Sequence, residues 1–518
     1  MVLQKQYPRL VARSCYGDTI RRRRPRGRDS KRPLATPFVP CLFLVILLAV
    51  GSAEPLLRGS HHVLYRNSTD IGTIPSSAVW TLPLHARSGT HHLDLVVGQP
   101  AQKRTLIVDT GSRLTAWVCK ECRDCGVHAN PAYGVAASST AVVNSCGRCD
   151  WPDVSTSSDT ASSCQRQRQQ QQQKDSFHLP DRHGGDPNSR CSMRQRYTEG
   201  SSWAAHEVND IVILPVHSSR ASQTDQPQSP ARNNTIDPAV TALWQQDGME
   251  TTIPFTFGCQ TSVHSLFRGQ YADGILGLER TEKSLVHQLF VQGLLPESVF
   301  SLCLTREQGI FGLGGAASSV AVNGTTIALE PMRFTPLGRH HGWYAVTIMQ
   351  VYMRNNKNET VSVAAVDSKE AASFHRGKGT ILDSGTTDTY LPAAIANAFA
   401  AAWLQLTGLQ LAKQRAHRYT YQEFLELPSV ILILQDNVTL SIPAANYMEG
   451  LPDNFDYNNG NDDGQSKAWS DTRELTNRVY VNEPTGAVLG LNAMFGYDIL
   501  YDSDGDRVGI ARANCQGR

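Results

Sequence analysis

The strongest chemical signal in this sequence is a short motif of an aspartate, a hydroxyl residue and a glycine, and it occurs twice. Asp109 lies in LIVDTGS and Asp383 lies in TILDSGTT, so an apolar stretch runs into each aspartate. An apolar-apolar-Gly segment follows each copy, within ADGILGL (272–278) and AVLGLNAMFG (487–496). One such tripeptide would be an ordinary turn. The repeated order instead predicts a duplication on the scale of a lobe, with one aspartate in each half.

A pair of carboxylates brought together in this way is suited to hydrolysis of an amide bond. Two like charges within hydrogen-bonding distance cannot both ionise cheaply, so the pair shares one proton. One carboxylate then acts as a general base on a water, and the protonated one donates to the carbonyl oxygen of the substrate. We therefore expect Asp109 and Asp383 to be catalytic, by a chemistry that needs neither a metal nor an organic cofactor.

The residues around each aspartate fit a supporting role. Glycine permits a tight backbone turn that a Cβ would obstruct. Hydroxyl groups beside a carboxylate orient it by hydrogen bonding, although the same residue types also cap ordinary turns. The residues expected to support the two aspartates are Thr110, Gly111, Ser112, Ser384, Gly385 and Thr386.

The elements that must position these residues are predicted to be mainly β-strands. HLDLVVG (92–98) and RTLIVDTGS (104–112) alternate apolar and polar residues and are rich in β-branched side chains, which is typical of strands. The best helix signal is Ala393–Leu406, with Gly408 as its stop. Polar stretches are expected to be surface loops, and the first contains a glutamine run that predicts disorder. These stretches are 150–190, 218–250 and 453–471.

Composition excludes several classes of protein. The chain has 518 residues, 40% of them hydrophobic and 19% charged, which is enough apolar material for a sizeable core. The net charge of +2 conceals +9 within residues 1–32, where 11 Lys and Arg face 2 Asp, so the remainder carries −7. Because the basic charge is confined to one tail, we expect no nucleic-acid binding. A single segment approaches the length and apolarity of a membrane span, which excludes a multi-pass membrane protein.

Residues 1–53 are predicted to direct the chain into the secretory pathway. A basic stretch, residues 21–32, precedes the apolar run Phe38–Val50, an order that leaves the basic flank in the cytosol. Two alternatives stay open: cleavage as a signal peptide after Ala53, or retention as a single-pass signal anchor. Residues 54–87 are expected to be a pro-segment or linker. Five N-x-S/T sequons are compatible with glycosylation; they are Asn67, Asn233, Asn323, Asn358 and Asn437.

The cysteines support the same compartment. Ten of the twelve lie beyond the N-terminal segment, an even number that suggests up to five disulfides in an oxidising lumen. The C-x2-C spacing near His128 is also a zinc-ligand spacing. We favour disulfides over zinc and expect no metal site. The disulfide candidates are Cys119, Cys122, Cys125, Cys146, Cys149, Cys164, Cys191, Cys259, Cys303 and Cys515.

Together these motifs resemble the pepsin family of aspartic proteases over about residues 88–515. The strand pair ending in DTGS, the DSGTT segment and YTEGSS at 197–202 each resemble a segment of that family. The resemblance implies a mainly β fold of two pseudo-symmetric, six-stranded lobes with a central cleft. The N-terminal lobe would cover 88–305, including the cysteine-rich insert, and the C-terminal lobe would cover 306–518. It also implies a monomer that acts on polypeptides.

The resemblance also assigns roles outside the two aspartate motifs. Tyr197 would lie on a hairpin flap over the substrate, with Glu199 and Gly200 beside it; the alternatives are a cross-strand aromatic and a solvated hairpin charge. On the flap, Glu199 would favour a basic substrate side chain, best an arginine. Cys303 is expected to pair with Cys515, because the family often ties the lobe junction to the C-terminal strand.

A narrower resemblance, to nepenthesin-type and plasmepsin V-type members, rests on the spacing that starts at Cys119, on CGVHANP (125–131) and on the acidic flap. It implies a processing protease of the endoplasmic reticulum that recognises an upstream arginine. Thr198, where that subgroup has a cysteine, departs from the pattern. The alternatives are an acidic vacuolar or digestive protease and a catalytically silent relative that binds peptides.

Overall fold

A computed structural model of the chain describes residues 79–145, 149–151, 190–216, 249–322, 325–338, 342–412, 415–451 and 472–516. These residues all belong to one compact unit that spans residues 72–518. The predicted signal segment and all but the margins of the three predicted polar loops lie outside the described residues. Within the described ranges, no helix is long and apolar enough to cross a membrane.

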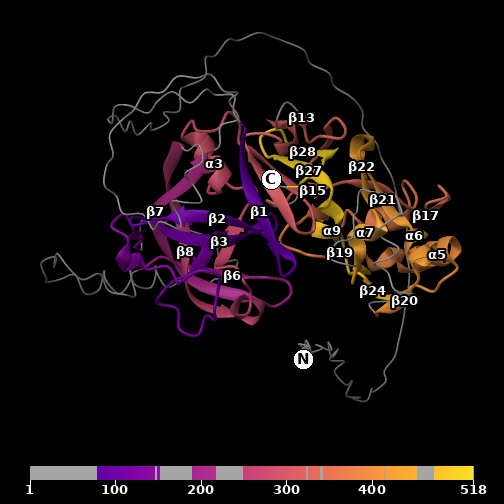
Figure 1. The fold of residues 1–518 in the computed structure, drawn as a ribbon, viewed down its shortest axis with the longest axis horizontal. Helices are drawn as coiled ribbons and strands as arrows, with labels where there is room; N and C mark the ends of the chain where they lie inside the picture. The colour runs from indigo at the N-terminus through magenta and orange to yellow at the C-terminus, as the bar shows by residue number, and fades with distance from the viewer. Residues whose placement is uncertain are drawn as a thin grey trace, which may run out of the picture. The chain divides into compact units, whose positions relative to one another are not determined.

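Strands dominate the structure (Figure 1), and the mainly β, two-lobed fold expected from the sequence is present. The largest sheet has 14 strands, in the order β14-β28-β27-β10-β11-β1-β2-β3-β9-β4-β8-β7-β5, with β6 paired to β7. Its strands in the N-terminal lobe are β2 (Thr90–Val97), β3 (Gln102–Asp109), β4 (Ala116–Val118), β5 (Val142–Val143), β6 (Ser192–Arg196), β7 (Ser202–Val216), β8 (Met249–His264) and β9 (Gly274–Gly277). The others are β1 (Trp80–Arg87), β10 (Val299–Leu304), β11 (Gln308–Leu313), β14 (Arg333–Pro336), β27 (Tyr497–Asp502) and β28 (Arg507–Arg512).

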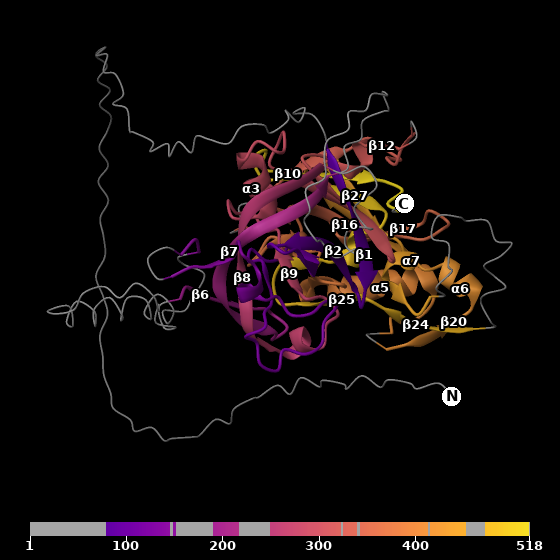
Figure 2. The same ribbon diagram turned by 60° about the vertical axis from the view of Figure 1, so that its left-hand side comes forward.

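The N-terminal lobe delivers its aspartate at the end of a buried strand. The two strands predicted over 92–98 and 104–112 are present as the hairpin β2–β3, and β3 ends at Asp109. The apolar-Gly segment forms β9, which runs parallel to β3 and pairs Asp109 with Gly277. The long strands β7 and β8 lie side by side across this lobe (Figure 2).

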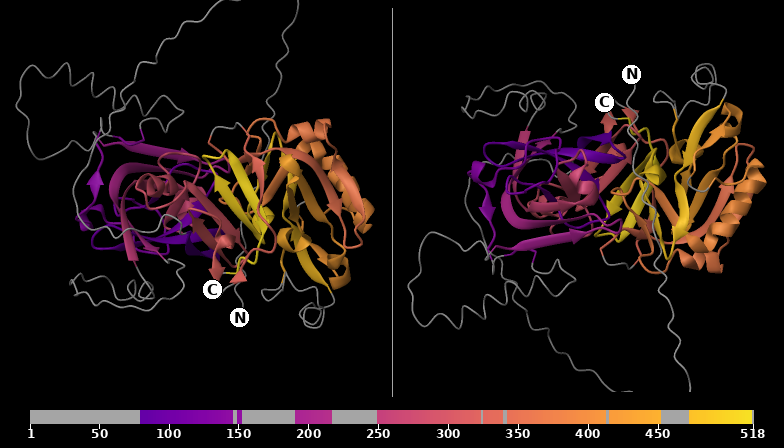
Figure 3. Two further views of the ribbon diagram at one scale, coloured as in Figure 1. Left: turned by 90° about the horizontal axis from the view of Figure 1, so that it is seen from above. Right: turned by 90° about the horizontal axis from the view of Figure 1, so that it is seen from below.

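The strands from β14 to β1 join the two lobes, and Figure 3 shows the yellow C-terminal strands between them. Residues 80–87, the last eight of the range predicted as a pro-segment or linker (54–87), form β1 and pair with both β11 and β2. The side chains of Trp80, Leu82 and Leu84 alternate into the core. The predicted lobe boundary at 305/306 lies in the turn of the β10–β11 hairpin, inside the shared sheet.

The C-terminal lobe repeats the arrangement around its own aspartate. β18 (Thr380–Leu382) ends next to Asp383 and runs parallel to β26 (Ala487–Leu489), the second apolar-Gly segment. The same five-stranded sheet contains β15 (Ala345–Val346), β19 (Thr389–Pro392) and β25 (Val479–Glu483). A four-stranded sheet contains β17 (Thr360–Ala364), β16 (Ile348–Arg354), β21 (Ser429–Leu434) and β22 (Thr439–Ile442). Smaller sheets contain β20 (His417–Tyr419), β24 (Arg473–Asn477) and β23 (Met448–Glu449), and β12 (Ala321–Val322) and β13 (Thr325–Thr326).

The helices are short, and the predicted helix over 393–406 is the longest of those described. It begins as the 3-10 turn η5 (Ala393–Ile395), continues as α5 (Ala396–Thr407), and ends at Gly408 in a left-handed conformation, φ 69°. α5 buries Phe399 and Trp403. The other helices are α3 (Leu285–Val291), α4 (Lys369–Ser373), α6 (Tyr421–Leu425), α7 (Ala444–Tyr447) and α9 (Leu491–Met494). The remaining 3-10 turns are η1 (Val135–Ala137), η3 (Ser265–Arg268), η4 (Ala317–Ser319) and η6 (Gln435–Asn437).

Candidate active site

The two aspartate motifs meet at the junction of the lobes, where each loop is hydrogen-bonded to the other. The Thr110 hydroxyl donates to the Leu382 carbonyl oxygen over 2.8 Å and accepts from the Ser384 backbone N–H over 2.9 Å. The Ser384 hydroxyl does the reverse, donating to Val108 O (2.8 Å) and accepting from the Thr110 N–H (3.1 Å). Both residues are about 1% exposed. The hydroxyls predicted to support the aspartates therefore bridge the lobes.

Each carboxylate is held by its own loop in the same way. Asp109 accepts from the Gly111 N–H (2.8 Å) and from the Ser112 hydroxyl (2.5 Å). Asp383 accepts from the Gly385 N–H (2.9 Å) and from the Thr386 hydroxyl (2.7 Å). All six residues that the sequence places around the aspartates thus lie in the structure where they hydrogen-bond a carboxylate or its loop.

The glycine of each loop lies under the aspartate of the opposite lobe. A Cβ on Gly111 would lie 2.5 Å from Asp383 Oδ1, and a Cβ on Gly385 would lie 2.6 Å from Asp109 Cγ. Real Cβ atoms essentially never come so close to a neighbour. Glycine is therefore required at both positions because the carboxylate of the opposite lobe comes so close to each of them. This requirement adds to the tight turn that the sequence predicts.

The electrostatics of the pair favour a shared proton. Burial raises the pKa of Asp109, and the neighbouring charge of Asp383 raises it further against the lowering effect of the Ser112 and Gly111 hydrogen bonds. Burial also raises the pKa of Asp383 above its ordinary value, opposed by hydrogen bonds from Thr386, Gly385 and Asp109. The two groups are coupled, so the raised pKa belongs to the pair. One proton bound between two carboxylates supplies a general base and a general acid together.

The hairpin formed by β6 and β7 carries Tyr197 toward the dyad. Tyr197 N–H donates to Ser201 O across the turn (2.8 Å), and the ring packs on Phe267 with centroids 5.2 Å apart. Trp203 Nε1 donates to the Tyr197 hydroxyl (3.3 Å). Burial raises the pKa of Tyr197, the charge of Asp109 adds to the rise, and hydrogen bonds to Trp203 and Ser112 oppose it. The structure thus brings Tyr197 within electrostatic reach of Asp109 on a β-hairpin.

Comparison with known proteins assigns this arrangement to a family. A family model described as "Eukaryotic aspartyl protease" matches residues 247–513, just over half of the chain. This chain belongs to the eukaryotic aspartyl protease family. A second model, described as "Xylanase inhibitor N-terminal", matches residues 92–315 and so covers most of the N-terminal lobe.

Relatives of this aspartyl protease family member are distant. The chain is 26% identical to Aspartic protease 5 of Toxoplasma gondii over 47% of its own length and 22% of the relative's. It is 24% identical to Plasmepsin V of Plasmodium falciparum over 43% of this chain and 29% of that relative. It is also 24% identical to an aspartic proteinase of Oryza sativa subsp. japonica over 62% of this chain and 60% of that relative. The match to each of the first two relatives spans less than a third of that relative's length.

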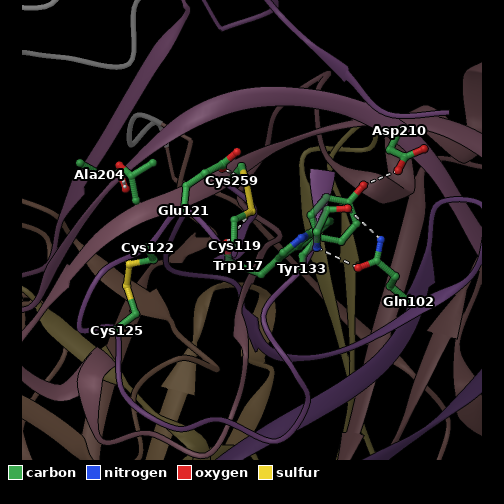
Figure 4. Close-up of a disulfide and its surroundings, with 12 residues drawn as sticks. Gln102, Trp117, Cys119, Glu121, Cys122, Cys125, Tyr133, Ala204, Asp210 and Cys259 are labelled. Atoms are coloured by element: carbon green, nitrogen blue, oxygen red, sulfur yellow. Dashed lines mark hydrogen bonds between the residues drawn. A yellow bond between two sulfur atoms is a disulfide. The ribbon is translucent and has the colours of Figure 1, made fainter. Parts of the chain in front are cut away.

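The cysteines form disulfides in this aspartyl protease fold (Figure 4). The predicted pair Cys303–Cys515 is confirmed and ties β10 to the C-terminal segment after β28. The other bridges are Cys119–Cys259, Cys122–Cys125 and Cys149–Cys191. Cys146 and Cys164 lie outside the described residues. The bridges occupy the sulfurs that the zinc alternative would need, and both ring nitrogens of His128 face backbone carbonyls.

The tip of the β6–β7 hairpin places Glu199 and Gly200 differently from Tyr197. Both residues are exposed at the turn, and Gly200 has a φ of 98° that favours glycine. No hydrogen bond or ion pair joins the Glu199 carboxylate to another described residue. The structure thus leaves Glu199 free at the edge of the hairpin, whereas the ring of Tyr197 packs inward.

Sequence reasoning missed two tryptophans of the site. Trp203 Nε1 donates to the Tyr197 hydroxyl, and Trp343 Nε1 donates to Gly111 O in the aspartate loop (3.1 Å). Trp203 is six residues after Tyr197, on the returning strand of the β6–β7 hairpin. Its position in that hairpin could have identified it as a neighbour of Tyr197. Trp343 comes from a loop before β15, and nothing in the local sequence points to its partner.

Proposed function

We propose that this chain is an aspartic endopeptidase that hydrolyses peptide bonds of polypeptides. The observation that carries the proposal is the coupled pair Asp109 and Asp383, held by matching hydrogen bonds and with raised pKa values. Membership of the aspartyl protease family supports it. Retaining one proton between the carboxylates keeps one of them ionised and one protonated in the resting enzyme.

The geometry suits acid–base catalysis on a bound water. The ionised carboxylate removes a proton from the water while the water oxygen attacks the scissile carbonyl carbon. At the same time the protonated carboxyl donates its proton to the carbonyl oxygen. In the second step the protonated carboxyl donates its proton to the amide nitrogen, and the ionised carboxylate removes a proton from a hydroxyl of the tetrahedral intermediate. The C–N bond then breaks to give a carboxylic acid and an amine, and the pair again holds one proton. The hydrogen bonds from Gly111, Ser112, Gly385 and Thr386 hold both carboxylates in place throughout, so the protein reorganises little.

The flap supplies the wall that closes over the substrate. Tyr197 is fixed by Trp203 and Phe267, so its ring presents a preformed apolar surface beside the dyad. A peptide between the flap and the aspartates would lose water on both sides, which strengthens the electrostatic interactions at the scissile bond. This role for Tyr197, with Gly200 at the turn, is part of the proposal.

The substrates proposed are polypeptides of the secretory pathway, cut downstream of an arginine. The disulfides support an oxidising compartment, and the described sequons Asn358 and Asn437 are exposed. The exposed Glu199 carboxylate, free of partners among the described residues, is suited to bind a guanidinium bidentately. Gln270 lies three residues after Phe267, whose ring packs on Tyr197, and is proposed to contact the same arginine side chain.

A peptide library cut at pH 4 to 7.5 tests this function. We expect cleavage with arginine selected upstream of the cut, and a weaker preference for arginine over alanine in Glu199→Ala. Glu282→Ala, an exposed acid away from the flap, is the matched control. An unchanged preference in Glu199→Ala would remove that residue from the substrate site while leaving the endopeptidase itself intact. An acidic optimum with broad cutting would assign the enzyme to digestion instead of processing.

The second candidate function is a catalytically silent relative that binds peptides. The match of residues 92–315 to a model described as a xylanase inhibitor N-terminal region favours it. Retention of both aspartates and of Tyr197 favours the enzyme. Peptide binding without cleavage at any pH would support the silent relative.

A further inference from the structure

Glu279 is a buried acid beside the active site that the proposed mechanism does not use. It lies two residues after the end of β9 and is 9% exposed. Its backbone N–H donates to Ser112 O (3.0 Å), and the preceding Leu278 N–H donates to Asp109 O (2.8 Å). The segment that follows β9 therefore carries an acid onto the loop of the first aspartate.

The carboxyl of Glu279 packs against a segment that precedes β15. A Cβ on Gly342 would lie 2.9 Å from Glu279 Cδ and 3.0 Å from Oε1, so the carboxyl takes up the space beside this glycine. The Arg280 N–H donates to Gly342 O (2.9 Å) and fixes the same contact through the backbone. The acid thus lies where the chain after β9 meets the chain before β15.

Both residues that hold the Asp109 carboxylate are held in turn at this contact. The Gly111 N–H and the Ser112 hydroxyl donate to the carboxylate. Gly111 O accepts from Trp343 Nε1 (3.1 Å). Ser112 O accepts from Glu279 N–H (3.0 Å). A shift of the segment that carries Trp343 would therefore disturb the donors that orient the aspartate.

Three charged or titratable side chains lie around Glu279. Arg113 acts on the carboxyl through its positive charge. The Arg280 guanidinium is paired with Asp506. Burial raises the pKa of Tyr344, and the charge of Glu279 adds to the rise. The part of the chain that the structure describes contains no hydrogen bond or ion pair to the Glu279 carboxyl.

The environment of Glu279 favours its neutral form. Burial raises the pKa of the carboxyl from 4.5 to about 7, and the charge of Arg113 only partly opposes this rise. A buried carboxylate without a hydrogen-bonded partner costs free energy, whereas a neutral carboxyl is tolerated there. The ionised form is therefore stabilised by any movement that admits water to the contact with Gly342.

We propose that Glu279 is a positioning residue of the active site, whose neutral carboxyl keeps Gly342 and Trp343 against the aspartate loop. When the carboxyl ionises, the segment moves away so that water reaches the charge. Trp343 then leaves Gly111 O, and the loop no longer orients Asp109 for catalysis. The inference rests on the proposed function and adds to it a loss of activity near neutral pH that comes from outside the dyad.

Peptide cleavage from pH 5 to 8.5 by wild type and Glu279→Gln tests the effect on catalysis. Glutamine keeps the shape of the protonated acid and cannot ionise. We expect equal kcat/KM at pH 5 and about tenfold higher kcat/KM for Glu279→Gln at pH 8, where about nine tenths of the wild-type carboxyls are ionised. Glu282→Gln, at an exposed acid three residues further on, should follow wild type. Identical profiles for wild type and Glu279→Gln would overturn the proposal.

A double-mutant cycle with Trp343→Phe separates movement of the segment from a direct effect of the Glu279 charge on the dyad. Phenylalanine removes the indole N–H that binds Gly111 O. In that background Glu279→Gln should change kcat/KM at pH 8 by less than about twofold. An undiminished effect would assign the pH dependence to direct electrostatics and would contradict the positioning role.

Urea unfolding tests the neutral carboxyl without any cleavage. The chains carry Asp109→Asn, which prevents self-cleavage and leaves no coupled aspartate pair. Because the folded pKa of Glu279 is raised, its contribution to stability is fully present below pH 4.5 and is lost as the pH rises through about 7. The urea midpoint should therefore fall more between pH 4.5 and 8 with Glu279 than with Glu279→Gln.

The two measurements fail separately. An equal fall of the urea midpoint in the two chains would overturn the proposal for Glu279, even if the wild-type enzyme cleaves peptides. A wild-type chain that cleaves nothing, with the difference in urea midpoint intact, would overturn the endopeptidase function and leave the neutral contact of Glu279 supported.

Discussion

Replacing Thr110 by valine isolates the hydrogen bonds that join the two aspartate loops. Valine keeps the shape of the side chain but removes the hydroxyl, so Leu382 O and Ser384 N–H lose their partner in a buried region. Each unsatisfied buried backbone group costs about 1 to 3 kcal/mol. We expect Thr110→Val to lower the free energy of unfolding by about 2 to 4 kcal/mol. Because the loops carry the dyad, we also expect kcat to fall at least about tenfold.

Urea denaturation and peptide-cleavage kinetics measure the two effects together. Ser301→Ala is the control, because the Ser301 hydroxyl is fully buried and accepts from Ala317 N–H (2.7 Å), away from both aspartate loops. It should lower stability by about 1 to 3 kcal/mol and leave kcat unchanged. A Thr110→Val protein that unfolds at the same urea concentration as wild type would refute the role of these bonds. So would equal losses of kcat in the two variants.

Three further predictions follow from the site and its supports. Because the pKa values of both aspartates are raised in the folded state, their contribution to stability is fully present below the ordinary carboxyl pKa of 3.8. This contribution is lost as the pH rises through the folded pKa. Asp109→Asn should therefore lose less stability than wild type between pH 4 and 8 in urea titrations. A disulfide stabilises a protein more when it closes a longer loop. Removing the Cys303–Cys515 bridge, whose cysteines are 212 residues apart, by Cys303→Ala with Cys515→Ala should lower the free energy of unfolding by about 5 kcal/mol, against about 2 kcal/mol for Cys122→Ser with Cys125→Ser. Similar losses for the two bridges in thermal unfolding would contradict this dependence on loop length. Trp203→Phe removes the donor to the Tyr197 hydroxyl and also leaves a small cavity, because Trp203 is 2% exposed. It should lower kcat/KM about fivefold and the free energy of unfolding by about 1 to 2 kcal/mol, which steady-state kinetics and calorimetry check together.

The dyad could be predicted from the sequence because its signal is local and repeated. An apolar strand, an aspartate, a hydroxyl and a glycine are adjacent in the chain, and the structure places all of them at one junction. The helix ending at Gly408 was predictable from an equally local signal, whereas the hairpin that carries Tyr197 was expected from the family resemblance.

The remaining features depend on contacts between distant residues. Proline, histidine and arginine interrupt the apolar alternation of β1, so its sequence does not signal a strand. Its register against β11 nevertheless places Trp80, Leu82 and Leu84 in the core. The bond from Trp343 to Gly111 joins residues 232 positions apart. The Cys119–Cys259 bridge likewise spans 140 positions, and spacing alone cannot select it among the possible pairings.

The central claim, that two aspartates share a proton and cut peptide bonds, is tested most directly by peptide cleavage with single asparagine variants. Asp109→Asn and Asp383→Asn are compared with Asp436→Asn, an exposed turn residue with φ 60° that asparagine tolerates. We predict cleavage by wild type and Asp436→Asn and none by either dyad variant, with all four proteins folded. Cleavage that survives in Asp109→Asn or in Asp383→Asn would contradict the account.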